Sequence, residues 1–192
     1  GHFGPRTSGR RALLRRKRHS VILMRRYKTP LIALSILIVL VVVTCCPFGQ
    51  RVTLRTREGT MLFQSYVPKG EKVWILYTHS VNKGLVEDGY EPVGGQIVLC
   101  SSRFRQYGAG IPEPCRGQTF KAHGGYYEIS GYDIALDTQW TYVGRIADHR
   151  LRIGEDGDLV HYNVLAQPGT VLGLSADSWS ILKEIKWRCH IE

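Results

Sequence analysis

The residues best placed to do chemistry lie in two short stretches, Tyr77–Asp88 and Arg103–Pro112. The first contains an imidazole, His79, a few residues before two carboxylates, Glu87 and Asp88. A histidine beside a carboxylate can act as an oriented acid or base, or it can anchor a polar ligand. What these residues can do therefore depends on the element that brings them together.

A β-hairpin is the element that the pattern favours. Residues 73–81 are rich in aromatic and β-branched side chains, and residues 85–91 resume the strand. Between them, residues 82–84 (Asn-Lys-Gly) have the composition of a three-residue hairpin loop that ends on a left-handed glycine. This loop places His79 opposite Glu87 at the ~5 Å spacing of paired Cβ atoms. A two-residue loop would place Asp88 opposite His79 instead. The pair could bind a ligand, or it could be a cross-strand contact that satisfies a partly buried histidine.

One nucleophile pair is excluded by the same geometry. Ser80 follows His79 on the expected strand, so the two side chains point to opposite faces of the sheet. They cannot form a serine–histidine catalytic pair with each other.

The second stretch ends in Tyr107-Gly-Ala-Gly-Ile-Pro112. Its two glycines allow unusual backbone angles, and successive N–H groups in such a loop can form an anion-binding nest. The alternative is a sharp corner after the strand expected over residues 96–104. A dinucleotide fingerprint is excluded because the third glycine and the following helix are missing. The two stretches together give these candidates for ligand or partner binding: His79, Ser80, Asn82, Glu87, Tyr107, Gly108 and Gly110.

These motifs carry a resemblance to a known bacterial family. The chain resembles the domain of unknown function 1850 (DUF1850) over roughly residues 50–130. The resemblance rests on the order and spacing of three motifs: His79-Ser80-Val81, the acidic Glu87 and Gly108-Ala109-Gly110. The resemblance implies a small membrane-anchored extracytoplasmic accessory domain, linked to tripartite (TRAP) solute transporters of the TAXI type. It implies partners among the transporter subunits or their solute-binding protein, and it implies no established catalytic residues. The alternatives are an extracytoplasmic enzyme using His79 and Glu87, or a structural β-domain at the cell surface.

The charge of the chain is concentrated in its N-terminal tail. The formal net charge is +10, but ten of the 26 Lys and Arg residues lie in residues 1–30, which contain no acid. Residues 31–192 therefore carry 16 basic and 16 acidic side chains. Nucleic-acid binding depends on neutralising phosphates, so a neutral domain argues against that partner.

An aliphatic, uncharged run follows the basic tail, and we expect residues 31–48 to be a signal anchor. Basic residues before the run keep that side cytoplasmic, which would make the protein single-pass, with residues 50–192 outside the cytoplasm. An uncleaved anchor is favoured over lipidation at Cys45 and over ordinary secretion. Residues 1–23 precede the first methionine, Met24, and we expect them to be disordered and not native.

The rest of the chain predicts an all-β fold, an antiparallel β-sandwich or barrel-like domain. Residues 178–188 fit either of two patterns, because Trp179, Ile181, Ile185 and Trp187 alternate as in a strand, whereas Ile181, Leu182 and Ile185 share one face of a helix. We expect a short helix, capped by Asp177 or Ser178. Turn residues recur about every ten positions and separate strands expected near residues 51–56, 60–66, 72–81, 85–92, 96–104, 117–122, 126–130, 140–146, 150–153, 158–162 and 170–175.

No metal or cofactor is expected. The domain has three cysteines without CxxC spacing, which disfavours zinc. One disulfide, Cys100–Cys115, or three free thiols are the alternatives. The acidic run Glu155, Asp156 and Asp158 lacks the spacing of a calcium loop, so we interpret it as a solvated hairpin tip.

Overall fold

The computed structural model describes residues 30–47, 49–106, 111 and 113–189. It divides into two compact units, Gly1–Cys46 and Pro47–Glu192, and each is described by itself. The expectations for residues 1–23 lie outside the described residues.

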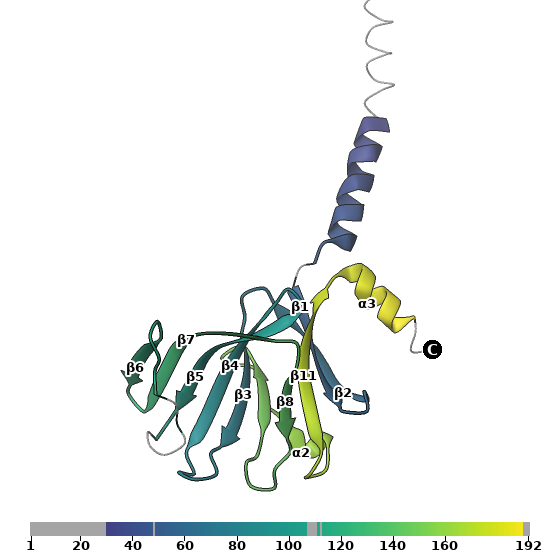
Figure 1. Cartoon of the computed structure of the whole chain (residues 1–192). Helices are drawn as coiled ribbons and strands as arrows, with labels where there is room; N and C mark the ends of the chain where they lie inside the picture. The colour runs from purple at the N-terminus through teal and green to yellow at the C-terminus, as the bar shows by residue number, and fades with distance from the viewer. Residues whose placement is uncertain (1–29, 48, 107–110, 112, 190–192) are drawn as a thin grey trace, which may run out of the picture. The chain divides into compact units, whose positions relative to one another are not determined.

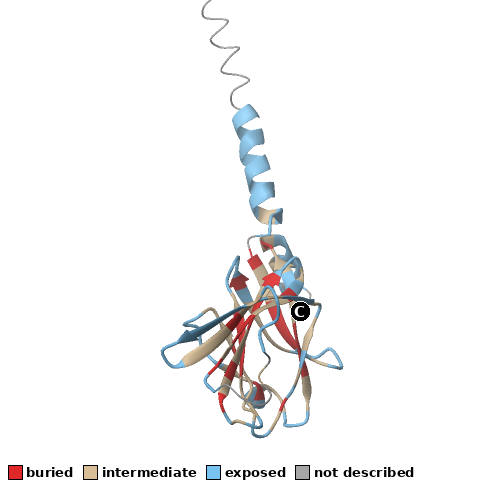
Figure 2. Cartoon of the chain, turned by 60° about the vertical axis from the view of Figure 1, so that its left-hand side comes forward, coloured by how far each residue is buried: buried red, intermediate tan, exposed pale blue. Residues whose placement is uncertain are grey.

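The first unit contains a helix over residues 30–45. Its leucine, isoleucine and valine side chains are exposed on every side, which Figure 2 shows as a pale blue helix. The hydroxyl groups of Ser35 and Thr44 each donate a hydrogen bond to the carbonyl four residues back, at Leu31 and Leu40. Within the described part of the chain, no helix is both long enough and apolar enough to span a membrane. The predicted membrane helix is therefore not confirmed.

The second unit is a sandwich of two antiparallel sheets, as the sequence predicts (Figure 1). The four-stranded sheet has the order β2-β1-β11-β8, and the seven-stranded sheet has the order β10-β9-β3-β4-β5-β7-β6. The strands are β1 (Gly49–Thr56), β2 (Met61–Pro68), β3 (Val73–Thr78), β4 (Leu85–Val93), β5 (Gln96–Phe104), β6 (Thr119–His123), β7 (Tyr126–Leu136), β8 (Gln139–Tyr142), β9 (Arg150–Ile153), β10 (Val160–His161) and β11 (Val171–Trp179). Each lies at or close to an expected position.

The main core lies between the two sheets. Alternate residues of a strand point to the same face of its sheet, and inward-facing apolar side chains of both sheets form this core. Val52 and Leu54 of β1 and Leu172 of β11 are fully buried against the inner face of the larger sheet, which contributes Val73 and Ile75. A second, smaller cluster is formed by Val86, Phe104 and Ile129.

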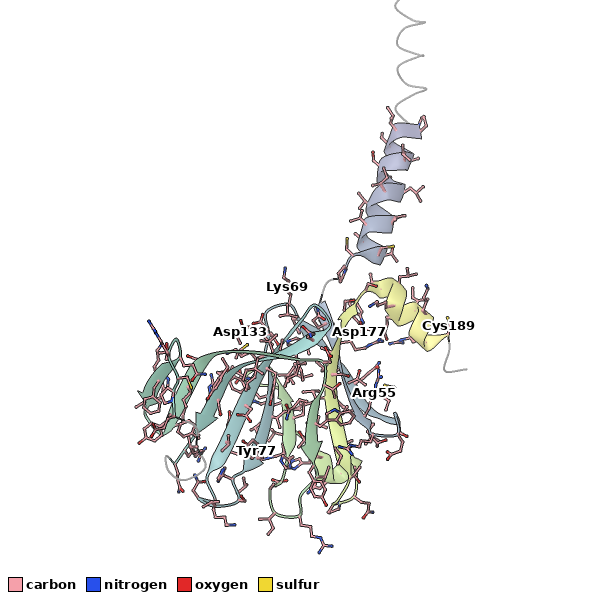
Figure 3. All side chains as sticks on the ribbon, in the orientation of Figure 1. Arg55, Lys69, Tyr77, Asp133, Asp177 and Cys189 are labelled. Carbon is pink, nitrogen blue, oxygen red and sulfur yellow. The ribbon has the colours of Figure 1, made fainter. Side chains whose placement is uncertain are left out.

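Two short helices complete the second unit, α2 (Tyr162–Leu165) and α3 (Ile181–Arg188). The expected C-terminal helix is thus confirmed as α3, but neither expected residue caps it. The Ser180 hydroxyl accepts a hydrogen bond from the Lys183 amide at 3.3 Å, which satisfies a free amide of the first turn. Asp177, labelled beside the start of the helix in Figure 3, instead binds the Lys183 ammonium group at 3.1 Å.

The five cysteines are all described and all free, so the Cys100–Cys115 disulfide is not formed. The thiol of Cys100 donates a hydrogen bond to the Val98 carbonyl. The alternative of free thiols holds for this domain.

Candidate functional site

The segment between β3 and β4 is a six-residue turn, residues 79–84, held by its own backbone. The His79 amide donates a hydrogen bond to the Gly84 carbonyl (2.9 Å), and the Lys83 amide donates one to the His79 carbonyl (3.1 Å). The Asn82 side-chain oxygen accepts a hydrogen bond from the Gly84 amide at 3.0 Å, which is an Asx turn. The left-handed residue is Lys83, with φ +58°, and not the glycine that follows it.

The predicted pairing of His79 with Glu87 is wrong. β3 ends at Thr78, which pairs with Leu85, and Glu87 lies opposite Leu76. Because the turn has six residues instead of three, the register moves by an odd number of residues and Glu87 comes to the other face of the sheet.

The other predicted residues of this stretch form part of the same turn. The His79 ring nitrogen Nδ1 accepts a hydrogen bond from a backbone amide two residues further on, and Ser80 is exposed. Asn82 donates from its side-chain amide to the carbonyl of Gln106 at 3.4 Å. The turn therefore contacts the segment that leads into the glycine loop. Three candidates lie outside the described residues: Tyr107, Gly108 and Gly110.

Glu87 lines a cavity of about 540 Å³ on the outer face of the seven-stranded sheet. The face follows from alternation along β3, where Val73 and Ile75 enter the main core and Trp74 and Leu76 point the other way. Strands β4, β5 and β9, the turn between β6 and β7 and the loop after β9 contribute its walls. The charged and aromatic lining residues are Glu87, Arg103, Arg105, Tyr126, Arg152, Glu155 and Asp156.

Arg103 lines this cavity and is held by several neighbours. Its Nε donates to the Glu128 carboxylate at 3.0 Å, and its Nη1 donates to the Glu155 carboxylate at 2.8 Å. Its guanidinium carbon lies 4.1 Å from the centroid of the Trp74 ring and 5.6 Å from that of Tyr126. Two aromatic rings and two carboxylates thus fix the direction of one arginine.

Arg152 lies beside Arg103 and shares one of its partners. Its Nη2 donates to Glu87 at 3.1 Å and lies 3.9 Å from the nearer oxygen of Glu155. The Arg152 guanidinium carbon is 6.0 Å from the Trp74 centroid, so the fully buried indole supports both arginines. Glu155 therefore bridges the two guanidinium groups from the solvent side.

Arg103 and Glu155 each stabilise the charged form of the other. The hydrogen bond from Arg103 is the largest effect on the Glu155 carboxyl, and it lowers the pKa of that group. Burial alone would lower the pKa of Arg103, but its bonds to Glu155 and Glu128 outweigh burial and raise that pKa. Arg103 therefore stays charged across the physiological range.

This arrangement can recognise an anion. Guanidinium forks that are held by aromatic rings and by carboxylates match the geometry of carboxylate or phosphate groups. Among the described residues no group of three or more His, Cys, Asp or Glu side chains could hold a metal ion. The guanidinium groups can bind such an anion through hydrogen bonds and charge.

A second polar group of residues lies on the inner face of the same sheet. Asp88 points inward and accepts a hydrogen bond from the Ser102 hydroxyl at 2.7 Å, and the Tyr77 hydroxyl also bonds to it. Burial raises the pKa of Asp88, and the two hydrogen bonds offset this only in part. Figure 3 labels Tyr77 on β3, where its ring packs against both core clusters.

Reasoning from the sequence missed Arg103, Arg152 and Trp74 as parts of a site. A signal was present, because an arginine stands at every second position in Arg103-Phe-Arg105 and again in Arg150-Leu-Arg152. That spacing puts the arginines of each strand on one face. The sequence alone does not show that β5 and β9 present the same face.

A glycine opposite Trp74 makes room for the indole. Gly89 pairs with Trp74 across β3 and β4, and a Cβ atom at Gly89 would lie 2.7 Å from the Trp74 ring and 2.9 Å from the Ser101 hydroxyl. We expect Gly89→Ala to lower the free energy of unfolding by about 1–3 kcal/mol, as overpacking does. Urea unfolding of the full chain measures the change.

The matched control is Gly124→Ala, because a Cβ there has no neighbour within 4 Å. This variant should remain within about 0.5 kcal/mol of the native chain. Equal stability of the two variants would show that Gly89 makes no room for the indole.

Comparison with known proteins agrees with the motifs. The family model described as "Domain of unknown function (DUF1850)" matches residues 73–159, a range that contains β3, β4, β5 and β9 and the charged cavity residues. No curated protein and no solved structure matches the chain. The recognition of a DUF1850 domain is thus confirmed over residues 73–159.

Proposed function

We propose that this chain is a membrane-anchored extracytoplasmic accessory domain that binds an anionic group in the cavity over Trp74. The observation that carries the proposal is the set of three arginines, Arg103, Arg105 and Arg152, that lines one cavity of about 540 Å³. That volume lies within the range of roughly 300–1,000 Å³ typical of small-molecule sites. Arginine forks bind carboxylates and phosphates by paired hydrogen bonds.

The cellular setting is part of the same proposal. Resemblance to the DUF1850 family supports a place beside a TAXI-type TRAP transporter, with its subunits or its solute-binding protein as partners. The exposed apolar side chains over residues 30–45 support an anchor within residues 31–48, because a helix that is apolar on all sides needs an apolar environment. The basic residues before it support an extracytoplasmic domain at the cell membrane.

The alternative that this chain is an enzyme depended on one predicted pair of residues. That alternative used His79 and Glu87 as an acid–base pair, and these residues do not face one another across β3 and β4. Glu87 is bound to Arg152, and the His79 ring bonds to its own turn.

Binding of a simple anion tests the proposal. The Nε–Hε resonances of the arginines of the ¹⁵N-labelled full chain, in detergent, can be followed by NMR during titration with acetate and with inorganic phosphate. We expect saturable shifts of the Arg103 and Arg152 resonances and none with choline. Arg105→Gln should weaken binding roughly two- to fivefold, because one exposed charge of the lining is lost.

The control is Arg145→Gln, which removes the same charge from an exposed residue that does not line the cavity. It should leave the affinity unchanged. If neither anion gives a saturable shift, or if both variants weaken binding equally, the cavity is not the binding site and the proposal is overturned.

A further inference from the structure

The three carboxylates that contact the arginine pair are not equivalent. Glu87 and Glu128 are largely buried, with 19% and 18% of their side chains exposed, and each binds one arginine. Glu155 is 57% exposed and reaches both arginines from outside. The buried glutamates balance the arginines one to one, so the Glu155 carboxylate is a third negative charge shared by the pair.

Glu155 also lies where a side chain can leave without disturbing the sheet. It follows Gly154, a left-handed residue with φ +70° whose amide donates to the Lys72 carbonyl at 2.8 Å. This bond fixes the base of the loop after β9. Rotation of the exposed Glu155 side chain about its own bonds is then enough to free Arg103 Nη1.

We propose that Glu155 occupies the position of a ligand carboxylate, and that a small organic carboxylate displaces it to bind Arg103 and Arg152. The inference rests on the proposed function, because it concerns the same cavity. It names the class of ligand and the side chain that occupies the binding position when no ligand is bound. Exchange of one carboxylate for another keeps the charge balance of the network. An incoming carboxylate therefore makes the contacts that Glu155 now makes.

The remaining lining residues indicate what the rest of the ligand resembles. The side chains of Leu85 and Tyr126 also line the cavity, and its volume is far larger than one carboxylate. A carboxylate joined to an apolar or aromatic body would fill this space and pack on these side chains. The geometry points to an aryl or alkyl carboxylate and away from a bare inorganic anion.

Titration with a matched pair of probes tests the inference. Phenylacetate carries the carboxylate and an apolar body, and phenylacetamide has the same shape without the charge. The full chain in detergent is titrated with each while the arginine Nε–Hε resonances are followed. Phenylacetate should bind and the amide should not. In Glu155→Gln phenylacetate should bind roughly threefold or more tightly, because the competing charge is gone.

The control is Asp158→Asn, which removes one charge from an exposed residue of the same loop that does not line the cavity. Asp158 forms no ion pair with any residue that the structure describes. It should change the affinity by less than about 1.5-fold. In the native chain, saturating phenylacetate should also move the Glu155 carboxyl ¹³C resonance toward that of a solvated glutamate.

Three results would overturn the inference. Unchanged or weaker binding of phenylacetate by Glu155→Gln would mean that Glu155 does not occupy the ligand position. An unmoved Glu155 resonance at saturation would mean that it is not displaced. If acetate and phosphate shift the arginines of the native chain but phenylacetate does not, the ligand class is wrong while the proposed function stands; if no anion binds to any variant, both fail.

Discussion

Replacing Trp74 with alanine is expected to lower the free energy of unfolding by about 3–5 kcal/mol. The indole is fully buried, although it lies on the outer face of the larger sheet, because Arg103, Arg152 and Lys72 cover it. The variant would leave a void beneath these charges and would remove the ring that orients Arg103. Urea unfolding of the full chain measures the loss.

The matched control is Trp140→Ala, since Trp140 is 47% exposed on β8. This variant should lose far less stability than Trp74→Ala, because much of its ring is already in water. A loss below about 1 kcal/mol at Trp74 would show that the outer face of the sheet does not act as a second packed layer.

Asp88→Asn should change how stability depends on pH. Burial raises the pKa of Asp88 in the folded protein, so the folded state holds this proton more tightly than the unfolded state. Its contribution to stability is complete below the unfolded pKa of about 4 and is lost as the pH rises through the raised folded-state pKa. From about pH 4 upward, the variant should therefore gain stability relative to the native chain, by about 1.4 kcal/mol per unit of pKa elevation.

Denaturation of both proteins between pH 4 and pH 8 gives this difference. The control is Asp133→Asn on β7, an exposed aspartate labelled in Figure 3, which should show no such trend. A constant difference between Asp88→Asn and the native chain across this range would contradict the assigned role of burial.

Much of the fold could be predicted because strands and turns leave local signals. β5 and β9 begin and end where the alternation and turn residues indicate, at residues 96–104 and 150–153. α3 follows from its apolar spacing, although its cap, Ser180, was not identified. These features depend on neighbouring residues and on burial of one face.

The register of β3 and β4 could not be predicted, because it depends on one turn. Asn-Lys-Gly is typical of a tight loop, but here Lys83 adopts the left-handed conformation and His79 joins the turn. The length of that turn decides which residue of β3 lies opposite Glu87, and this residue is Leu76 instead of His79. One local misreading therefore produced the wrong pair.

The candidate site was harder to predict than the fold, because the residues that form it are distant from one another in sequence. Glu155 looked like a solvated hairpin tip, yet it binds Arg103, 52 residues away. Trp74 looked like an ordinary strand residue. Only the pairing order β9-β3-β4-β5 places these side chains on one surface.

The two core clusters differ greatly in the number of apolar side chains that they bury. This difference affects how cooperatively the domain unfolds. The smaller cluster has three fully or nearly buried side chains, Val86, Phe104 and Ile129, against twelve in the larger. Less apolar burial holds that end closed, so we expect it to open locally before the whole domain unfolds. Asp88 shares β4 with Val86, so each such opening lets water reach its carboxyl group. Proton exchange at this buried acid is thus governed by local breathing of the small cluster, while the larger core stays intact.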